Sequence, residues 1–199
     1  MMLLKSTFLH KLDGWYKTTW YKKTVILTNS IELQPEVAWE VDVQYLALKA
    51  LHIFAVVIFL GNIIAGLFWH THAVRTRDPK VISHAMGGII LSDRVFTVPG
   101  VIAILMSGVL LAILGGYPLL RTHWILWSIA LFSLSGLAFM FRVAPLQRRL
   151  LSMARVGAER GDFDYTPYHR LAVRWELWGA VALLAPVAAL CVMTLKPTW

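Results

Sequence analysis

Four long apolar runs constrain the fold of this chain more than any other feature. They cover residues 50–69, 95–114, 124–141 and 177–195. An α-helix needs roughly 20 apolar residues to cross a hydrocarbon core of ~30 Å, whereas a membrane β-strand needs only ~10 residues that alternate in polarity. The runs therefore predict an all-α protein that folds as a four-helix transmembrane bundle.

Composition excludes the main alternatives to a membrane protein. Of the 199 residues, 58% are apolar and only 15% are charged, with a mean hydropathy of +0.63. An ordinary cytosolic enzyme or a disordered chain does not have this balance. The single cysteine, Cys191, excludes an internal disulfide framework. The chain is predicted to be an integral membrane protein whose first partner is the lipid bilayer.

The connections between the runs predict how the helices are ordered and oriented. The link 115–123 is short and rich in turn-forming residues, so the second and third helices are antiparallel neighbours. The loops after the first and third helices carry most of the arginines, and basic loops stay in the cytoplasm. We therefore expect both termini outside. The net charge of +8 is explained by this topology, and no nucleic-acid recognition motif accompanies it.

Two domains are expected. Residues 1–43 form a polar and aromatic arm, either an interfacial or partner-binding segment or a solvated tail, and residues 44–199 form the bundle. Residues 81–91 are expected to extend the second helix into the cytoplasm, and 147–158 read as a further extension beyond the third. Pro99 is predicted to kink the second helix, and Arg142 and Pro145 to end the third transmembrane helix.

His52 is the first candidate for a functional residue, because ionisable side chains within apolar segments are costly. A neutral imidazole that faces a bundle interior can bind haem iron. Lys49 lies about one turn away on the same helix face, and Met106 lies at a similar depth on the second helix. These two residues are candidates for a propionate contact or a sixth ligand. The alternative is a structural histidine bonded to a backbone carbonyl or to a serine of another helix.

A second candidate is a set of charged residues predicted at one level, the cytoplasmic boundary. Ion pairing among them would close the bundle, or the arginines would hold carboxylates such as haem propionates or an anionic substrate. The alternative is simple anchoring by arginines that reach the interface. The main members of this set are Asp93, Arg94, Arg142, Arg174 and Glu176.

Several segments together resemble a family of bacterial four-helix integral membrane proteins of unknown function. The resemblance covers about residues 44–198 and leaves the N-terminal arm unexplained. It implies a multi-pass protein of a bacterial cytoplasmic membrane. The segments are 45–52, 92–100, Ser107-Gly108, Trp124, 145–149, Arg174-Trp175 and Lys196-Pro197.

The first helix is also similar to that of the haem-binding four-helix protoporphyrinogen oxidases of bacteria, which open with a Lys-x-x-His pattern. Lys49 and His52 match that pattern, and the later motifs of those enzymes are not matched. The similarity implies a b-type haem held by His52, without implying oxidase activity.

Two functional hypotheses follow from the sequence. The leading one is a membrane protein that carries a b-type haem and acts in electron transfer or tetrapyrrole chemistry. The alternative is a cofactor-free accessory subunit of a larger membrane complex, or a homo-oligomer. A transporter ranks third, because discontinuous helices are absent from the pattern. No nucleophile–base pair, phosphate loop or zinc motif appears in the chain, so the sequence does not identify an enzyme.

Overall fold

A computed structural model describes residues 35–197, with side chains from residue 43 onward. The chain divides into two compact units, residues 1–46 and 47–199, and the helical bundle is the second unit. The α-helices are α2 (Pro35–Arg75), α3 (Pro79–Ser92), α4 (Val98–Leu114), α5 (His123–Ala138), α6 (Ala144–Arg160) and α7 (Tyr165–Leu195). Two π-helical segments, η1 (Asp93–Thr97) and η2 (Phe139–Val143), join α3 to α4 and α5 to α6. The predicted N-terminal arm lies largely outside the described residues.

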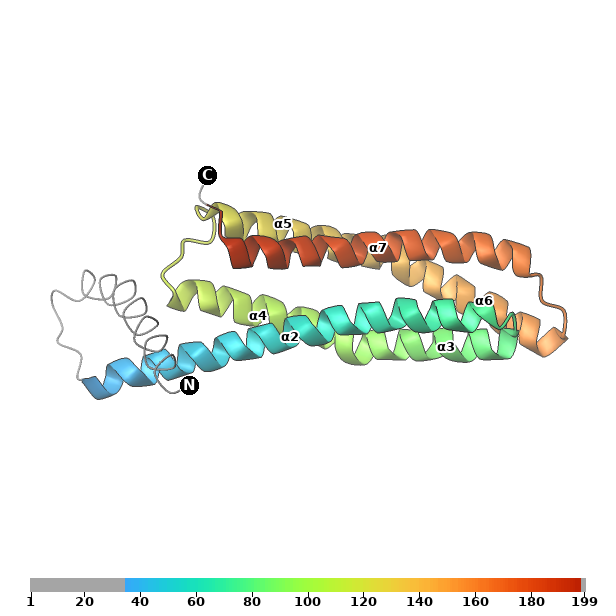
Figure 1. Cartoon of the computed structure of the whole chain (residues 1–199), viewed down its shortest axis with the longest axis horizontal. Helices are drawn as coiled ribbons and strands as arrows, with labels where there is room; N and C mark the ends of the chain where they lie inside the picture. The colour runs from blue at the N-terminus through green and yellow to red at the C-terminus, as the bar shows by residue number, and fades with distance from the viewer. Residues whose placement is uncertain (1–34, 198–199) are drawn as a thin grey trace, which may run out of the picture. The chain divides into compact units, whose positions relative to one another are not determined.

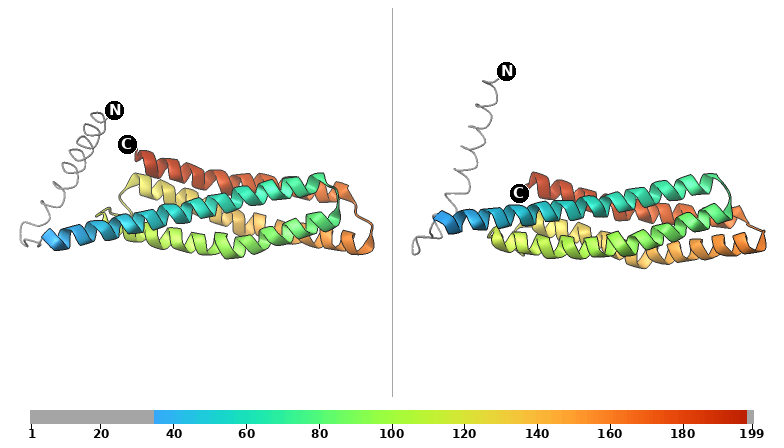
Figure 2. Two further views of the ribbon diagram at one scale, coloured as in Figure 1. Left: turned by 60° about the horizontal axis from the view of Figure 1, so that its bottom comes forward. Right: turned by 90° about the horizontal axis from the view of Figure 1, so that it is seen from below.

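The described helices form four continuous rods, each long and apolar enough to cross a membrane. The four spans are Val43–Arg75, Pro79–Leu114, His123–Arg160 and Tyr165–Leu195. In the bundle, the α2–α3 turn and the α6–α7 loop lie at one end, and the α4–α5 loop and the last turn of α7 lie at the other (Figures 1 and 2). The predicted all-α architecture of four antiparallel transmembrane helices is confirmed.

The second and third spans are much longer than a bilayer requires. They contain 36 and 38 residues, and at about 1.5 Å per residue each exceeds the ~30 Å hydrocarbon thickness. The extra length is α3 and α6, which confirms the expected helical extensions at 81–91 and 147–158. The prediction that Arg142 and Pro145 end the third helix is wrong. The α-helical part α5 already ends at Ala138, and the rod continues through η2 and α6 to Arg160.

Proline explains where the two π-helical segments occur. Pro99 and Pro145 stand in the first turns of α4 and α6, directly after η1 and η2. A proline inside a helix has no N–H to donate, and its ring clashes with the carbonyl four residues earlier. A wider π turn before the proline relieves this clash and lets the rod continue. The interruption predicted at Pro99 therefore takes the form of a π segment.

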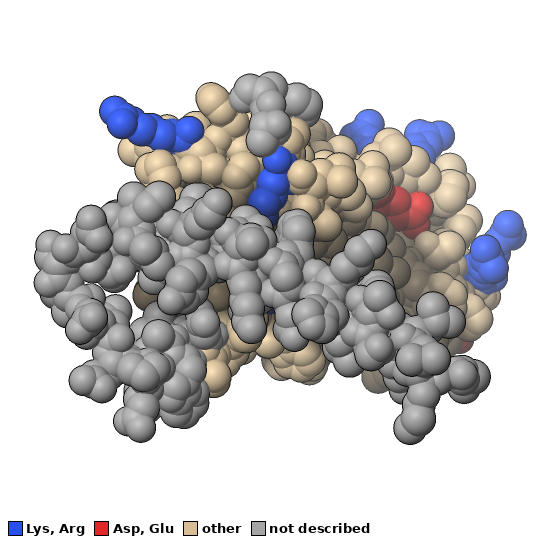
Figure 3. Space-filling view, turned by 60° about the vertical axis from the view of Figure 1, so that its left-hand side comes forward, with Lys and Arg blue, Asp and Glu red and all other residues tan. Residues whose placement is uncertain are grey.

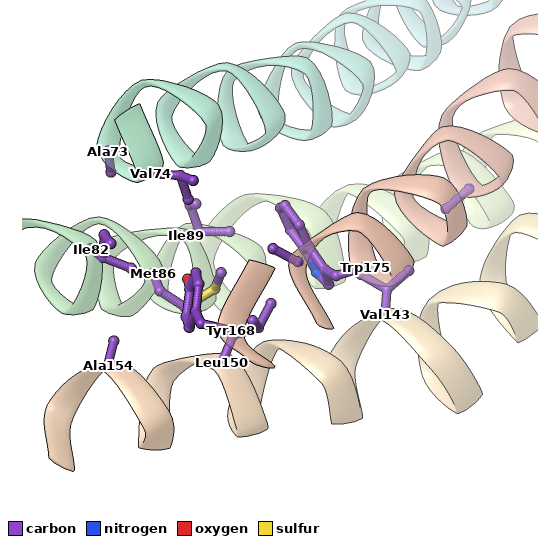
Figure 4. Close-up of a cluster of buried hydrophobic side chains, with 12 residues drawn as sticks. Ala73, Val74, Ile82, Met86, Ile89, Val143, Leu150, Ala154, Tyr168 and Trp175 are labelled. Carbon is purple, nitrogen blue, oxygen red and sulfur yellow. The ribbon is translucent and has the colours of Figure 1, made fainter. Parts of the chain in front are cut away.

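Close packing is concentrated at the α3–α6 end of the bundle. Large side chains with no more than 2% exposure, among them Met86, Leu150, Tyr168 and Trp175, form one cluster there (Figure 4). The α4–α5 half has a smaller cluster around Phe59 and Ile104. This difference agrees with the expectation that α3 and α6 extend beyond the bilayer, since water drives burial only there, whereas apolar side chains within the bilayer can face outward.

The surface of the described spans fits a lipid environment. Many large apolar side chains are half exposed or more, including Phe54 at 62% and Phe141 at 66%. On the face drawn in Figure 3 most of the described surface is neither acidic nor basic, and Lys and Arg appear in separate places. Outward-facing apolar side chains are expected where acyl chains replace water.

Candidate functional site

Asp93 is the centre of a buried polar network that joins three of the four spans. Asp93 is 8% exposed and Thr97 and Gln147 are 4% exposed. The Oδ1 atom of Asp93 accepts hydrogen bonds from Asn62 Nδ2 at 3.0 Å and from Thr97 Oγ1 at 2.9 Å. The Oδ2 atom of Asp93 accepts a hydrogen bond from Gln147 Nε2 at 2.8 Å. Asn62 Nδ2 also donates to Thr97 Oγ1 at 2.9 Å, so the donors are connected to one another.

The carboxylate of Asp93 therefore bonds to neutral groups rather than to an arginine. Between residues 43 and 197 no lysine or arginine lies within ion-pair distance of a carboxylate, and the one basic side chain that does is His70, next to Glu176. This corrects the idea that Asp93 closes the bundle by pairing with an arginine. The physical reason is the side-chain direction: Arg94 follows Asp93 by one residue and is exposed, as expected when successive residues of a helix point about 100° apart.

A second polar group surrounds His70, which is completely buried. His70 Nδ1 lies 3.2 Å from Glu176 Oε1, and His70 Nε2 lies 3.2 Å from Tyr168 Oη. The Trp175 ring packs edge-on against the imidazole, with 4.6 Å between the ring centroids. Since both ring nitrogens already have partners on α7, His70 joins α2 to α7, and it is not placed as a free ligand.

Trp175 carries an unsatisfied donor next to this group. Its Nε1 is the one buried side-chain polar atom without a hydrogen-bond partner in the part of the chain that the structure describes. Trp175 is 2% exposed and belongs to the larger hydrophobic cluster drawn in Figure 4. The ring contributes its apolar area to the core while its N–H remains unpaired.

His52 lies in the other half of the bundle, against α4. Its Nδ1 is 2.8 Å from Ser107 Oγ. The imidazole ring also lies on Gly108, where a Cβ atom would come within 3.2 Å of His52 Cε1. Ser107 donates its own hydroxyl hydrogen to the carbonyl of Ala103, so we assign the His52–Ser107 bond as Nδ1–H donating to Oγ, which leaves the Nε2 lone pair unprotonated.

The other sequence-predicted residues are not gathered around His52. Lys49 is exposed, and Met106 is 63% exposed. Arg142 lies over the ring of Trp178, with Cζ 5.3 Å from the ring centroid, which is the anchoring arrangement expected at an interface. Arg174 is exposed, whereas Glu176 bonds to His70. The predicted boundary set is thus divided between an internal network and an outward-facing basic surface.

Sequence reasoning did not assign the partners of these residues. Asn62 is a polar residue within the first apolar run, and Thr97 lies one turn after Asp93, so the sequence contains a signal for both. Gln147 sits among arginines on α6, and its burial could not be read from composition. Ser107 is a small polar residue within an apolar run, a type that transmembrane helices use for interhelical hydrogen bonds.

Two open grooves adjoin the Asp93 network. One, of about 550 Å³, lies between α2 and α3 and includes Asn62, His72 and His84 among its lining residues. The other, of about 380 Å³, lies between α3–η1 and α6 and includes Arg94. Within the described residues no group of three or more His, Cys, Asp or Glu side chains is placed to hold a metal ion.

Comparison with known proteins agrees with this architecture. Residues 46–197 match the family DUF2269, described as a predicted integral membrane protein. The chain belongs to the DUF2269 family. Neither the curated proteins nor the solved structures contain a match. The expected membership in a membrane-protein family of unknown function is confirmed, and the matched region of this DUF2269 protein contains the Asp93 network, the His70 group and His52.

Proposed function

We propose that this integral membrane protein binds a b-type haem through Nε2 of His52 and acts in electron transfer or tetrapyrrole chemistry. One observation carries the proposal. His52 Nδ1 lies 2.8 Å from Ser107 Oγ, and with the proton assigned to Nδ1 the lone pair of Nε2 is the one that can bind a metal. Histidines that bind metals commonly donate the other ring N–H to a neighbouring acceptor, which fixes the ring and its tautomer.

The donor set around His52 fits one axial position of a haem. Gly108 leaves room for the imidazole on α4, and Ser107 orients it. Met106 and Lys49 are exposed, so we do not assign either as a sixth ligand. When bound, haem would supply one-electron chemistry, while the chain's contribution would be to hold His52 neutral and oriented within the apolar part of the bundle.

Optical spectra of the full-length protein test the proposal directly. The protein is produced in cells with adequate haem supply, purified in detergent and measured oxidised and reduced. We expect a Soret band and a reduced α-band. His52→Ala should lose most of this signal, and Ser107→Ala should weaken haem retention by about tenfold because it removes the acceptor for Nδ1–H.

The matched control is His72→Ala, which changes an exposed histidine on the same helix and should leave the spectrum unchanged. His123→Ala, at the start of α5, should do the same. A colourless wild-type protein contradicts the proposal, as does a His52→Ala variant with the wild-type spectrum.

The second candidate function is that of a cofactor-free accessory subunit in a larger membrane complex. The hydrogen bond between His52 and Ser107 also favours this function, because bonds of this kind hold transmembrane helices together without any cofactor. On this proposal His52→Ala lowers the thermal stability of a colourless protein. The optical spectrum of the purified protein therefore distinguishes the two candidate functions before any partner is known.

A further inference from the structure

An open groove with a basic wall runs between α3–η1 and α6, away from His52. Its volume is about 380 Å³. The groove has three arginines, one serine and three aliphatic side chains, so it combines a strongly cationic region with an apolar one. The lining residues are Ile90, Arg94, Arg148, Leu151, Ser152, Arg155 and Val156.

The three arginines concentrate positive charge without a counter-charge. All of them are exposed, and among the side chains from residue 43 to residue 197 none forms an ion pair with them, since the ion pair found there joins His70 to Glu176. They come from two rods: Arg94 from η1, and Arg148 and Arg155 from α6, seven residues and two helical turns apart. A guanidinium group matches phosphate geometry with two parallel hydrogen bonds.

The groove lies where the chain leaves its apolar run. Arg94 is followed directly by Val95, which is 52% exposed, and Leu91 on the preceding turn is 60% exposed. Outward-facing apolar side chains therefore adjoin the arginines on the same rod. This arrangement offers a surface for acyl chains next to a charged pocket, and it lies at the end of the bundle that carries the basic loops.

We propose that this groove binds the phosphate of an anionic phospholipid headgroup from the leaflet that faces the basic loops. The arginines would hold the phosphate oxygens, and Ile90, Leu151 and Val156 would contact the first carbons of the lipid. The apolar half of the groove favours a lipid over free phosphate, which has no carbon to bury there. The proposal is independent of haem, because no groove residue contacts His52 or Ser107 in the observed hydrogen bonds.

Native mass spectrometry of the detergent-solubilised full-length protein can measure the binding. The protein is titrated with phosphatidylglycerol and with phosphatidylcholine of the same acyl chains. Both lipids carry the phosphodiester group, but the choline ammonium of phosphatidylcholine brings a positive charge next to the arginines. Since one charge at such a surface changes binding roughly fivefold or more, we expect the anionic lipid to bind about tenfold more tightly. The double variant Arg148→Gln/Arg155→Gln should lose that preference and retain the weak binding of phosphatidylcholine.

Arg149→Gln is the matched control, because Arg149 is exposed on α6 beside Arg148 but does not line the groove. It should bind both lipids within about twofold of the wild type, as expected for a surface charge outside the site. Equal binding of the two lipids by the wild type overturns the proposal, as does an equal loss in Arg149→Gln. Competition by inorganic phosphate provides the last test: if millimolar phosphate binds the groove and displaces the lipid completely, the ligand is a soluble phosphate and the lipid assignment is wrong.

Discussion

At the residue scale, the environment of Asp93 shows how an acidic side chain can be buried in a membrane protein without a neighbouring cation. Neutral donors from α2, η1 and α6 surround it, two of them amides and one a hydroxyl. Each hydrogen bond to a carboxylate is stronger than one between neutral groups. The same network also satisfies the side chains of Asn62 and Gln147, which would be costly to bury alone.

Removal of the Asp93 carboxylate should leave several buried donors without an acceptor. We expect Asp93→Ala to lower the free energy of unfolding by about 3 kcal/mol, because each orphaned buried donor costs roughly 1–3 kcal/mol. Asp93→Asn should cost less, since an amide oxygen can still accept from Asn62 and Thr97. The measurement is the midpoint of thermal unfolding in detergent.

The control for this pair is Asp162→Ala, which removes an exposed carboxylate in the loop before α7 and should leave the midpoint unchanged. If Asp93→Ala melts at the temperature of the wild type, the network does not stabilise the bundle.

Residue identity was easier to predict than residue partners. The cost of ionisable groups in apolar segments singled out His52, whereas Asp93 was predicted only as a member of the charged set at the boundary, and its burial was not foreseen. For His52 the sequence offered the right class of partner, a serine of another helix. Which serine, and which donors surround Asp93, could not be predicted, because a partner depends on the rotation of each helix about its axis. Two π segments shift that rotation, so a strict 3.6-residue period does not apply across the rods.

At the element scale, close contact between α2 and α4 depends on the absence of a side chain at Gly108. A Cβ there would lie 3.2 Å from His52 Cε1 and 3.7 Å from Nδ1. Small residues at such positions let transmembrane helices approach each other closely. A glycine within an apolar run is a sequence signal for close helix approach, but it does not reveal that the neighbour of Gly108 is the imidazole of His52.

Gly108→Ala should push the imidazole away from α4 and weaken its bond to Ser107. We expect a loss of about 1 kcal/mol in the free energy of unfolding, the cost of modest overpacking. A chemical-denaturation or thermal series in detergent measures this change.

Gly136→Ala is the companion substitution on α5, where an added Cβ has no neighbour within 4 Å among the described residues. It should raise stability by about 0.5 kcal/mol, because alanine is the better helix former. Equal effects of the two substitutions would remove the argument for a special contact at Gly108.

At the scale of the whole molecule, the apolar runs predicted the number and order of the helices well. The bilayer fixes the length of such a run, and a short link requires antiparallel neighbours, so few topologies remain. The true helix ends were harder to predict, because amphipathic residues beyond an apolar run form helices just as well, and α3 and α6 lengthen the second and third rods in this way. Which helix faces meet was not predictable at all.

The orientation of the bundle remains a prediction from charge. Arginines gather in the loops at one end, so residues near 77 and 155 should be cytoplasmic and both termini should be outside. Single cysteines in a Cys191→Ser background, necessary because Cys191 is exposed, can be labelled with an impermeant reagent in intact cells. If residues near 155 are labelled and the termini are not, the predicted orientation is wrong and the bundle is inserted the other way round.

The two π segments determine how the rods would respond to the loss of a single residue. A π turn is wound with a hydrogen bond from residue i to i+5, so η1 and η2 each hold one residue more than a regular helix of the same height. Deleting Phe96, which is 48% exposed, would allow α3 and α4 to join in a regular helix. Because the π turn absorbs its extra residue without adding height, the deletion would leave α3 and α4 in nearly the same relative orientation. Asp93 and Thr97 would then be three residues apart instead of four and would still lie on one helix face. A chain that has lost this single residue could therefore still cross the membrane four times with its acidic centre next to its donors.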